Sequence, residues 1–177
     1  LMQPHMGVDI NGKTLGIVGM GAIGQAVAKR AAKGFGMRVI YYSSSIKESA
    51  EKEYGAEFVE FDKLLSLSDF ISIHVPLTEK TKHLFSTQEF QAMKNTAIII
   101  NTARGPVVDE AALVEAIKDS QIRGAALDVF EEEPSIHPEL IKIKENVVLA
   151  PHIGSASLET RLWMEKMAAL NMVEGLK

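Results

Sequence analysis

Apolar residues follow two alternating patterns along this chain. Short runs of apolar and β-branched residues predict buried strands, and the segments between them carry apolar residues at helical spacing. The run Ala97–Ile100 is apolar throughout, as in a strand covered on both faces of a parallel sheet. Strands are expected at residues 14–18, 37–42, 57–59, 69–75, 96–100, 123–129 and 146–150, and helices at 25–33, 46–54, 61–68, 87–93, 109–118 and 157–176.

This alternation of strands and helices predicts an α/β fold, a doubly wound parallel sheet of the Rossmann type. At 177 residues the chain is expected to form one domain. Residues 1–12 are expected to be an N-terminal arm that ends in a turn at Asn11 and Gly12, and residues 13–177 the domain itself. Ligands bind such sheets beyond the carboxyl ends of the strands, so the candidate chemistry is sought there.

A glycine motif, Gly19-Met-Gly-Ala-Ile-Gly24, lies between the first predicted strand and the first predicted helix. In this context Gly19 permits a tight turn, Gly21 removes a side chain that would collide with a pyrophosphate, and Gly24 allows close packing of helix and strand. The helix N-terminus offers free N–H groups and a partial positive charge to phosphates. The motif therefore predicts a dinucleotide site, and a glycine-rich turn without a ligand is the alternative.

Four polar residues follow the carboxyl ends of later strands: Arg104, Asp128, Glu133 and His152. A histidine exchanges protons near neutral pH, and a neighbouring carboxylate fixes its tautomer and favours its protonated form. An arginine offers two parallel donors to a carboxylate. With a hydride from a nicotinamide ring, this set suits the interconversion of a 2-oxo acid and a 2-hydroxy acid.

Other polar residues have plainer interpretations. A loop arginine is usually a solvated cation, and Asp128 could be a cap at a strand end. Within Glu131-Glu-Glu133, the first two glutamates, Glu131 and Glu132, are expected to be solvated. His74 is expected to be a packed histidine rather than a catalytic one. The surface histidines are expected to be His5, His83 and His137.

Composition narrows the function classes. The net charge of −4 and the pI near 5.8 do not support a basic nucleic-acid-binding face. No run approaches the roughly 18 apolar residues of a membrane span, so no membrane partner is expected. The chain has no cysteine, which excludes disulfides and thiolate ligands and fits a reducing, cytoplasmic location. No pair of candidate ligands has the i, i+4 spacing of a helical metal site, and no metal is expected.

Segments that resemble one protein family recur in order along the chain. The chain resembles the cofactor domain of the D-isomer-specific 2-hydroxyacid dehydrogenases. The resemblance implies that Arg104 binds the substrate carboxylate and polarises its carbonyl, and that His152 is the general acid/base with Glu133 as its partner. It also implies that Asp128 hydrogen-bonds the nicotinamide carboxamide, and that the cofactor domain forms a homodimer. The matching segments are Gly19–Gly24, His74–Thr78, Asn101–Gly105, Leu127–Pro134 and Pro151–Ala156.

The end of the second strand departs from the pattern of NAD-specific domains. Such domains usually carry an acidic residue about 20 residues beyond the glycines, and here that position is Ser43. Hydroxyls on Ser43 and Ser44 and the ammonium of Lys47 could receive a 2′-phosphate, so we expect NADP, or use of both NADP and NAD. A serine turn without a ligand is the alternative. The full set of expected cofactor-binding residues is Gly19, Gly21, Ala22, Ile23, Gly24, Ser43, Ser44, Lys47, His74, Val75, Pro76, Thr81, Thr102, Ala103, Arg104, Asp128, His152 and Gly154.

The family's substrate domain is expected to be absent from this chain, whether through fragmentation or natural loss. Cofactor binding should survive that absence, but efficient turnover should not, because catalysis needs a positioned substrate and a closed, dry cleft. The Tyr41-Tyr-Ser43 strand end favours a glyoxylate or hydroxypyruvate reductase. A formate dehydrogenase is disfavoured, because that branch pairs its histidine with a glutamine. Two further readings stay open: a dinucleotide-sensing corepressor of the C-terminal-binding type, and a bare regulatory dinucleotide-binding module.

Overall fold

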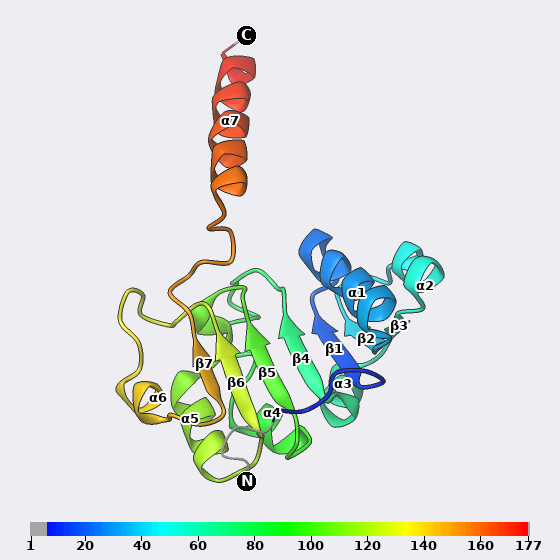
Figure 1. Ribbon diagram of the computed structural model, residues 1–177, viewed down its shortest axis with the longest axis vertical. Helices are drawn as coiled ribbons and strands as arrows, with labels where there is room; N and C mark the ends of the chain where they lie inside the picture. The colour runs from blue at the N-terminus through cyan, green and yellow to red at the C-terminus, as the bar shows by residue number, and fades with distance from the viewer. Residues whose placement is uncertain (1–6, 177) are drawn as a thin grey trace, which may run out of the picture.

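A computed structural model describes residues 7–176, whose seven strands form one parallel sheet in the order β3-β2-β1-β4-β5-β6-β7 (Figure 1). The doubly wound α/β fold is therefore confirmed. The strands are β1 (Thr14–Val18), β2 (Arg38–Tyr42), β3 (Glu57–Phe58), β4 (Phe70–Ile73), β5 (Ile98–Asn101), β6 (Gly124–Leu127) and β7 (Val147–Leu149). The helices are α1 (Ala22–Phe35), α2 (Glu48–Tyr54), α3 (Phe61–Leu67), α4 (Thr87–Ala92), the 3-10 helix η1 (Gly105–Val107), α5 (Glu110–Lys118), α6 (Pro138–Lys142) and α7 (Leu158–Gly175).

The chain order reverses direction across the sheet between β1 and β4. From this point β1, β2 and β3 follow one another toward one edge of the sheet, and β4 to β7 follow one another toward the opposite edge. At the reversal, the His74 amide donates to the Val18 carbonyl at 2.7 Å, so the ends of β1 and β4 lie side by side. Connections leave this point in opposite directions and open a crevice at the carboxyl edge, where ligands of such sheets bind.

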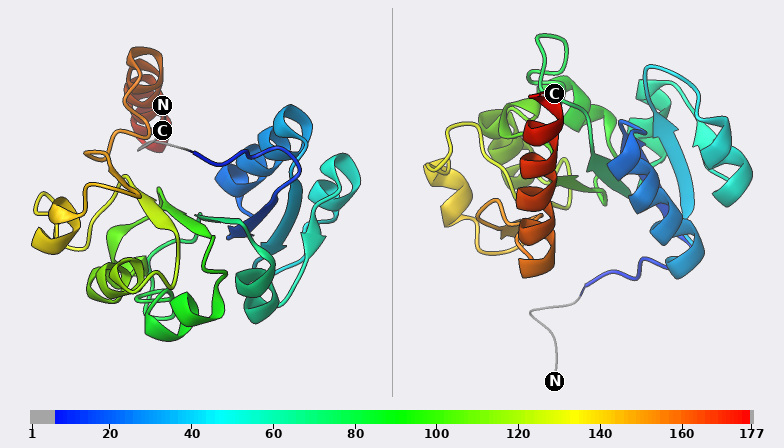
Figure 2. Two further views of the ribbon diagram at one scale, coloured as in Figure 1. Left: turned by 60° about the horizontal axis from the view of Figure 1, so that its bottom comes forward. Right: turned by 90° about the horizontal axis from the view of Figure 1, so that it is seen from above.

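Side chains alternate between two apolar layers, as the period of a strand requires. Val18 and Ile40 join the layer packed against α3, α4 and α5. Ile17 and Tyr41 join the opposite layer, packed against α1 and α2. Figure 2 shows these two groups of helices on opposite faces of the sheet. In β1 and β2, burial on both faces explains why the strand sequences are almost wholly apolar.

Helix α7 stands away from the sheet (Figure 1). The predicted long final helix is confirmed, with the Ser157 hydroxyl accepting from the Thr160 amide at 3.2 Å as its N-cap. None of its residues is buried, and Trp163 is 58% exposed. Its apolar side chains therefore do not belong to the core. The exposed ones are Leu158, Leu162, Trp163, Met164, Met167, Leu170, Met172 and Val173.

The predicted elements and the observed ones differ at a few places. Helix α1 begins at Ala22 rather than Gln25, because Gly21 serves as its N-cap and the helix starts inside the glycine motif. Two short helices, η1 and α6, were not predicted, because three and five residues are too few to show a helical period. The chain turns at residues 11–12 as expected, and His5 lies outside the described residues.

Candidate functional site

The three glycines of the motif differ in what the protein itself requires. Gly19 has φ +98°, and a Cβ there would lie 2.7 Å from the His74 carbonyl. A Cβ on Gly24 would overlap the Gly19 carbonyl. Gly21 has an ordinary φ of −76°, and a Cβ there would meet no atom within 4 Å. Folding therefore explains Gly19 and Gly24, whereas Gly21 borders open space that a ligand can occupy.

The N-terminus of α1 opens onto this space. No side chain caps the helix, and its first turn contains no acidic residue. The first N–H groups of a helix have no partner within the helix and carry a partial positive charge. An anionic phosphate fits this position, so the glycine turn has both the space and the charge for a dinucleotide.

One wall of the crevice is built by the loops that follow β4 and β5. A cavity of about 490 Å³ is lined by residues from both loops and from the start of α1. Seven of the residues expected at the cofactor are thus brought together. The lining consists of Ile23, His74, Val75, Pro76, Leu77, Thr102, Ala103 and Arg104.

Two residues that follow β4 differ in their relation to this wall. The Thr81 hydroxyl donates to the Pro76 carbonyl at 2.6 Å and accepts from the Thr78 amide at 2.8 Å. Thr81 therefore fixes the loop after β4 and does not line the cavity. His74 Nε2 lies 2.8 Å from the Ser72 hydroxyl, and burial lowers the pKa of the His74 ring, so a neutral packed histidine fits as expected.

The turn after β5 presents Arg104. Asn101 is fully buried, and its side chain accepts from the Ala103 amide and donates to the Arg104 carbonyl, each at 3.0 Å. The Arg104 guanidinium is exposed and donates to the Ala103 carbonyl at 2.6 Å. Sequence reasoning did not single out Asn101, although a polar residue that ends an apolar strand was the available signal.

His152 and Glu133 form the predicted pair. His152 Nδ1 lies 2.8 Å from Glu133 Oε2, and Glu133 Oε1 accepts from the Phe130 amide at 3.0 Å. The hydrogen bond with His152, and after it the one from the Phe130 amide, hold the pKa of the Glu133 carboxyl below its ordinary value. Against an ionised carboxylate Nδ1 carries the ring proton, which leaves Nε2 for exchange with a substrate. His152 also has φ +54°, a conformation that the surrounding contacts must hold.

Asp128 supplies part of that support. It is 8% exposed, and its carboxylate accepts from the amides of Ile153 and Gly154 at 2.8 and 2.7 Å. The structure thus displays the plainer role, an anchor at the strand end, and the anchored loop is the one that carries His152. Asp128, Thr102 and Gly154 also line a common cavity of about 240 Å³, so the three expected residues share one side of the crevice.

The end of β2 lies beside the glycine turn, where the Gly19 amide donates to the Tyr42 carbonyl at 2.9 Å. Ser43 is half-buried and Ser44 is exposed. The Lys47 ammonium donates to the Ser45 hydroxyl at 2.8 Å, and the Lys47 amide donates to the Tyr41 hydroxyl at 2.7 Å. The structure therefore joins Lys47 to Ser45 within the loop that also carries Ser43 and Ser44.

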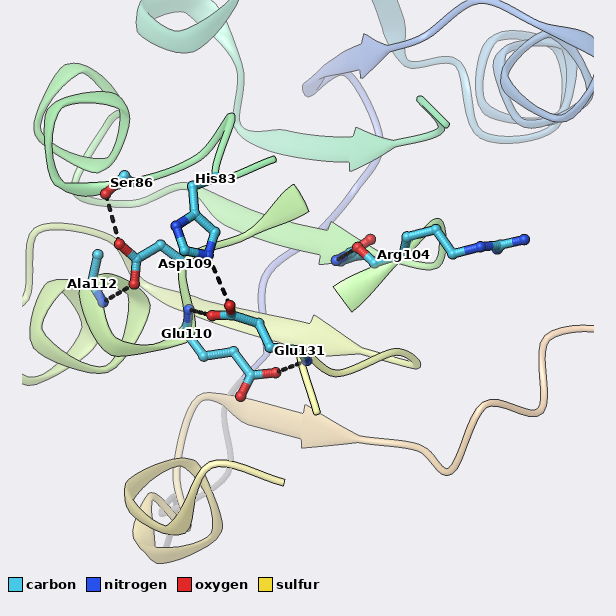
Figure 3. Close-up of polar contacts among 8 residues, drawn as sticks. His83, Ser86, Arg104, Asp109, Glu110, Ala112 and Glu131 are labelled. Atoms are coloured by element: carbon cyan, nitrogen blue, oxygen red, sulfur yellow. Dashed lines mark hydrogen bonds and ion pairs between the residues drawn. The ribbon is translucent and has the colours of Figure 1, made fainter. Parts of the chain in front are cut away.

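The expectation for Glu131 was wrong. Its side chain is not solvated but accepts from the Glu110 amide at 2.7 Å and contacts His83 Nε2 at 2.8 Å (Figure 3). His83 is exposed, as expected of a surface histidine, and this contact joins it to Glu131. His137 caps α6, where its Nδ1 accepts from the Glu139 amide at 3.3 Å. None of these pairings could be predicted from the local sequence, because each joins segments that are remote in the chain or belongs to an unpredicted helix.

Two further properties concern residues 7–176 alone. This part of the chain contains no group of three or more histidine, aspartate and glutamate side chains placed to hold a metal ion. None of its helices combines the length and the apolar character needed to cross a bilayer.

A parallel sheet with a glycine turn at its switch point and a His–Glu pair at later strand ends defines a dinucleotide-binding domain of the dehydrogenase class. Residues 2–154 match the sequence model of the D-isomer specific 2-hydroxyacid dehydrogenase NAD binding domain. The chain belongs to this family, as the resemblance of its motifs predicted. The match gives no support to the corepressor alternative.

Relatives with assigned names agree with this family. The chain is 58% identical over 168 residues to a glyoxylate reductase of Thermococcus litoralis, covering 95% of this chain and 50% of the relative. It is 57% identical over 170 residues to a glyoxylate reductase of Korarchaeum cryptofilum, with the same coverage of 95% and 50%. The chain therefore spans about half the length of these curated relatives.

Solved structures give the same result. The crystal structure of a glyoxylate reductase from Paecilomyes thermophila superimposes with a TM-score of 0.91 at 40% identity, over 97% of this chain and 52% of that one. A D-lactate dehydrogenase with NAD+ from Lactobacillus jensenii superimposes with a TM-score of 0.79 at 32% identity, over 90% and 51%.

Proposed function

We propose that this chain is the cofactor-binding half of an NAD(P)H-dependent enzyme that interconverts a small 2-oxo acid and its D-2-hydroxy acid. The observation that carries the proposal is the 2.8 Å contact between His152 Nδ1 and Glu133 Oε2 at the same sheet edge as the glycine turn. A bound nicotinamide would supply or accept the hydride.

The chain's own residues divide the remaining work. His152, oriented by Glu133, gives its Nε2 proton to the substrate carbonyl oxygen during reduction and takes it back during oxidation. Arg104 carries an exposed guanidinium, which suits it to hold the substrate carboxylate through paired donors. The loop residues that line the cavity after β4 and β5 exclude water from one side of the reaction. Further substrate contacts are proposed to come from a separate substrate domain.

Glyoxylate or hydroxypyruvate is the proposed substrate type. The support is that both curated relatives described above are named glyoxylate reductases and exceed 50% identity. The test follows the loss of NADPH absorbance on addition of glyoxylate, using the longest natural chain that contains these residues. We expect His152→Ala to lower the rate about 10²–10⁴-fold, the usual contribution of a general acid, with little change in cofactor affinity.

A second histidine provides the control for that test. His137→Asn keeps an N-cap acceptor on α6 and removes a ring that does not contact Glu133. This variant should retain the parent rate. Equal turnover by His152→Ala and the parent would remove His152 from the mechanism.

NADP is the proposed preferred cofactor. The support is the turn after β2, where Ser43 to Ser45 carry no carboxylate and the Lys47 ammonium donates to the Ser45 hydroxyl. A carboxylate at this position would repel a 2′-phosphate and bind ribose hydroxyls instead. Titration with NADPH and NADH should show tighter NADPH binding, reversed by Ser43→Asp. Tighter binding of NADH by the parent would overturn this preference.

Homodimerisation is proposed as well, and the support is the exposed apolar surface of α7. Contiguous exposed apolar surface of this kind often marks a protein–protein interface. Light scattering should give twice the mass of the chain, and Leu162→Glu with Leu170→Glu should shift the protein to a monomer. A parent protein that is monomeric at micromolar concentration would contradict the proposal.

A further inference from the structure

Glu131 connects three segments that are separated in the chain. It lies in the loop between β6 and α6, two residues before Glu133. Its carboxylate accepts from the Glu110 amide at 2.7 Å through Oε1 and contacts His83 Nε2 at 2.8 Å through Oε2. Figure 3 shows this contact network on one side of the loop and the Arg104 side chain extending away from it.

The contact with Glu110 is reciprocal. The Glu131 amide donates to Glu110 Oε1 at 2.8 Å, so each residue's carboxylate accepts from the other's backbone. Glu110 is only 5% exposed, which shields both bonds from water. The backbone at Glu131 is thus held at two points against the first turn of α5.

That first turn is itself fixed. Asp109 caps α5 by accepting from the Ala112 amide at 3.0 Å, and its other carboxylate oxygen accepts from the Ser86 hydroxyl at 2.9 Å. The Asp109 amide donates to the Phe85 carbonyl at 2.9 Å. Glu131 is therefore anchored to a part of the domain that is itself tied to the N-terminus of α4.

The peptide between Phe130 and Glu131 transmits this anchoring to the His–Glu pair. A Cβ on Gly105 would overlap the Phe130 carbonyl and lie 2.5 Å from the Glu131 nitrogen, so this peptide packs directly on the turn after Arg104. The amide at the other side of Phe130 donates to Glu133 Oε1 at 3.0 Å. The second oxygen of the same carboxylate then meets His152.

We propose that Glu131 is a positioning residue that sets the geometry of the His152–Glu133 pair by clamping the loop to α5. Its catalytic consequence rests on the proposed function, whereas the clamp itself rests on the contacts alone. Glu131 touches no reacting atom in this arrangement. Without the Glu131 carboxylate the loop loses its bonds to the Glu110 amide and to His83. Misplacement of a catalytic group by about 1 Å can cost about 10²-fold in rate.

Two substitutions of Glu131 separate the effect of its charge from the effect of its side-chain length. Glu131→Asp keeps the negative charge but shortens the side chain by one methylene. The shorter side chain loses either the hydrogen bond from the Glu110 amide or the contact with His83. Glu131→Gln loses the charge but keeps the length and an oxygen that accepts from the Glu110 amide. The other charged or titratable groups around the clamp are Arg104, Asp109, Glu110, Glu132, His83 and His137.

The readout is the pKa of the Glu133 carboxyl, measured by carbon-detected NMR titration of the side-chain carboxyl signals. We expect Glu131→Asp to raise the Glu133 pKa toward its ordinary value, because the hydrogen bonds from Phe130 and His152 weaken. Glu131→Gln should not raise it. Removal of a neighbouring charge alone acts in the opposite direction, since it lowers the pKa of a nearby carboxyl.

Glu132→Gln is the matched control, because Glu132 is an exposed neighbour of equal charge outside the clamp. It should leave the Glu133 pKa at or below that of the parent. A Glu131→Asp protein with the parent's Glu133 pKa, or a Glu131→Gln protein with a raised one, would overturn the proposal. Should Glu131→Asp fail to fold, the Glu131→Gln titration decides alone, and a raised Glu133 pKa in that variant overturns the proposal.

Kinetics separate this proposal from the proposed function. In the hydride-transfer assay Glu131→Asp should lower kcat about tenfold, with NADPH affinity unchanged and activity rescued in Glu131→Gln. An equal loss of cofactor affinity would indicate a merely structural role and overturn the proposal. Absence of turnover in the parent, together with the expected Glu133 titrations, would contradict the proposed function and leave the clamp established.

Discussion

Replacing Gly21 by alanine separates the needs of the ligand from those of the fold. The structure leaves open space at this Cβ and gives Gly21 an extended backbone with φ −76°. As an N-cap, alanine is worse than glycine by roughly 0.5–1 kcal/mol. Alanine also lowers the conformational entropy of the unfolded chain, which stabilises the folded protein by about 0.4–1 kcal/mol. The free energy of unfolding should therefore change by less than about 0.5 kcal/mol.

Cofactor affinity should respond very differently. A methyl group forced against a bound pyrophosphate costs about 1–3 kcal/mol, the range for added volume in a packed site. This corresponds to a loss of roughly 5–150-fold in affinity. Calorimetric titration with NADPH measures the affinity. Urea unfolding followed by far-UV circular dichroism measures the stability, because Trp163 is 58% exposed on α7 and would not report on the core.

Gly19→Ala is the matched control within the same motif. Its φ of +98° and a Cβ distance of 2.7 Å to the His74 carbonyl predict a loss of more than about 1 kcal/mol in stability. Gly21→Ala should thus lose cofactor affinity, whereas Gly19→Ala should lose stability. A Gly21→Ala protein that binds NADPH as tightly as the parent would refute the argument that a ligand, rather than the fold, requires this glycine.

Two further predictions concern the N-terminus of α5. Burial, followed by the nearby Glu131 carboxylate, raises the pKa of the Glu110 carboxyl above 4.5 in the folded protein. Its contribution to stability is therefore present below pH 4.5 and is lost as the pH rises through the raised value. Glu110→Gln keeps an oxygen that accepts from the Glu131 amide and should unfold at a higher temperature than the parent at pH 8. This difference in melting temperature should shrink toward pH 4. A difference that stays constant with pH would contradict the raised pKa of Glu110. Asp109→Ala removes the cap and the Ser86 partner and should cost about 1–2 kcal/mol in urea unfolding, whereas an unchanged midpoint would show that neither bond contributes.

Local sequence was sufficient for the elements that local physics determines. The apolar run Thr14–Val18, the glycines after it and the helix formers beyond predicted β1, the turn and α1. Strand ends then located Arg104, Glu133 and His152, because the carboxyl ends of parallel strands share one edge.

What the sequence could not supply depends on contacts between remote segments. The clamp between Glu110 and Glu131 joins residues 21 positions apart, and nothing in Glu131-Glu-Glu133 distinguishes the bonded glutamate from the solvated one. The two amides that bond Asp128 lie 25 and 26 positions away. The exposure of α7 is equally invisible, since apolar helical spacing predicts a helix but not the surface that it covers.

The measurement that tests the central claim most directly is a titration of the isotopically labelled chain with NADPH, followed by amide chemical shifts. Saturable shifts are predicted for the amides of residues 21–24 and 43–47, of Val75 and Leu77, and of residues 102–104 and 152–154, at the carboxyl edge of the sheet. The amide chemical shifts of α6, which lies away from the glycine turn, should not change. No saturable shifts, or shifts confined to α6 and α7, would contradict a dinucleotide site at the glycine turn.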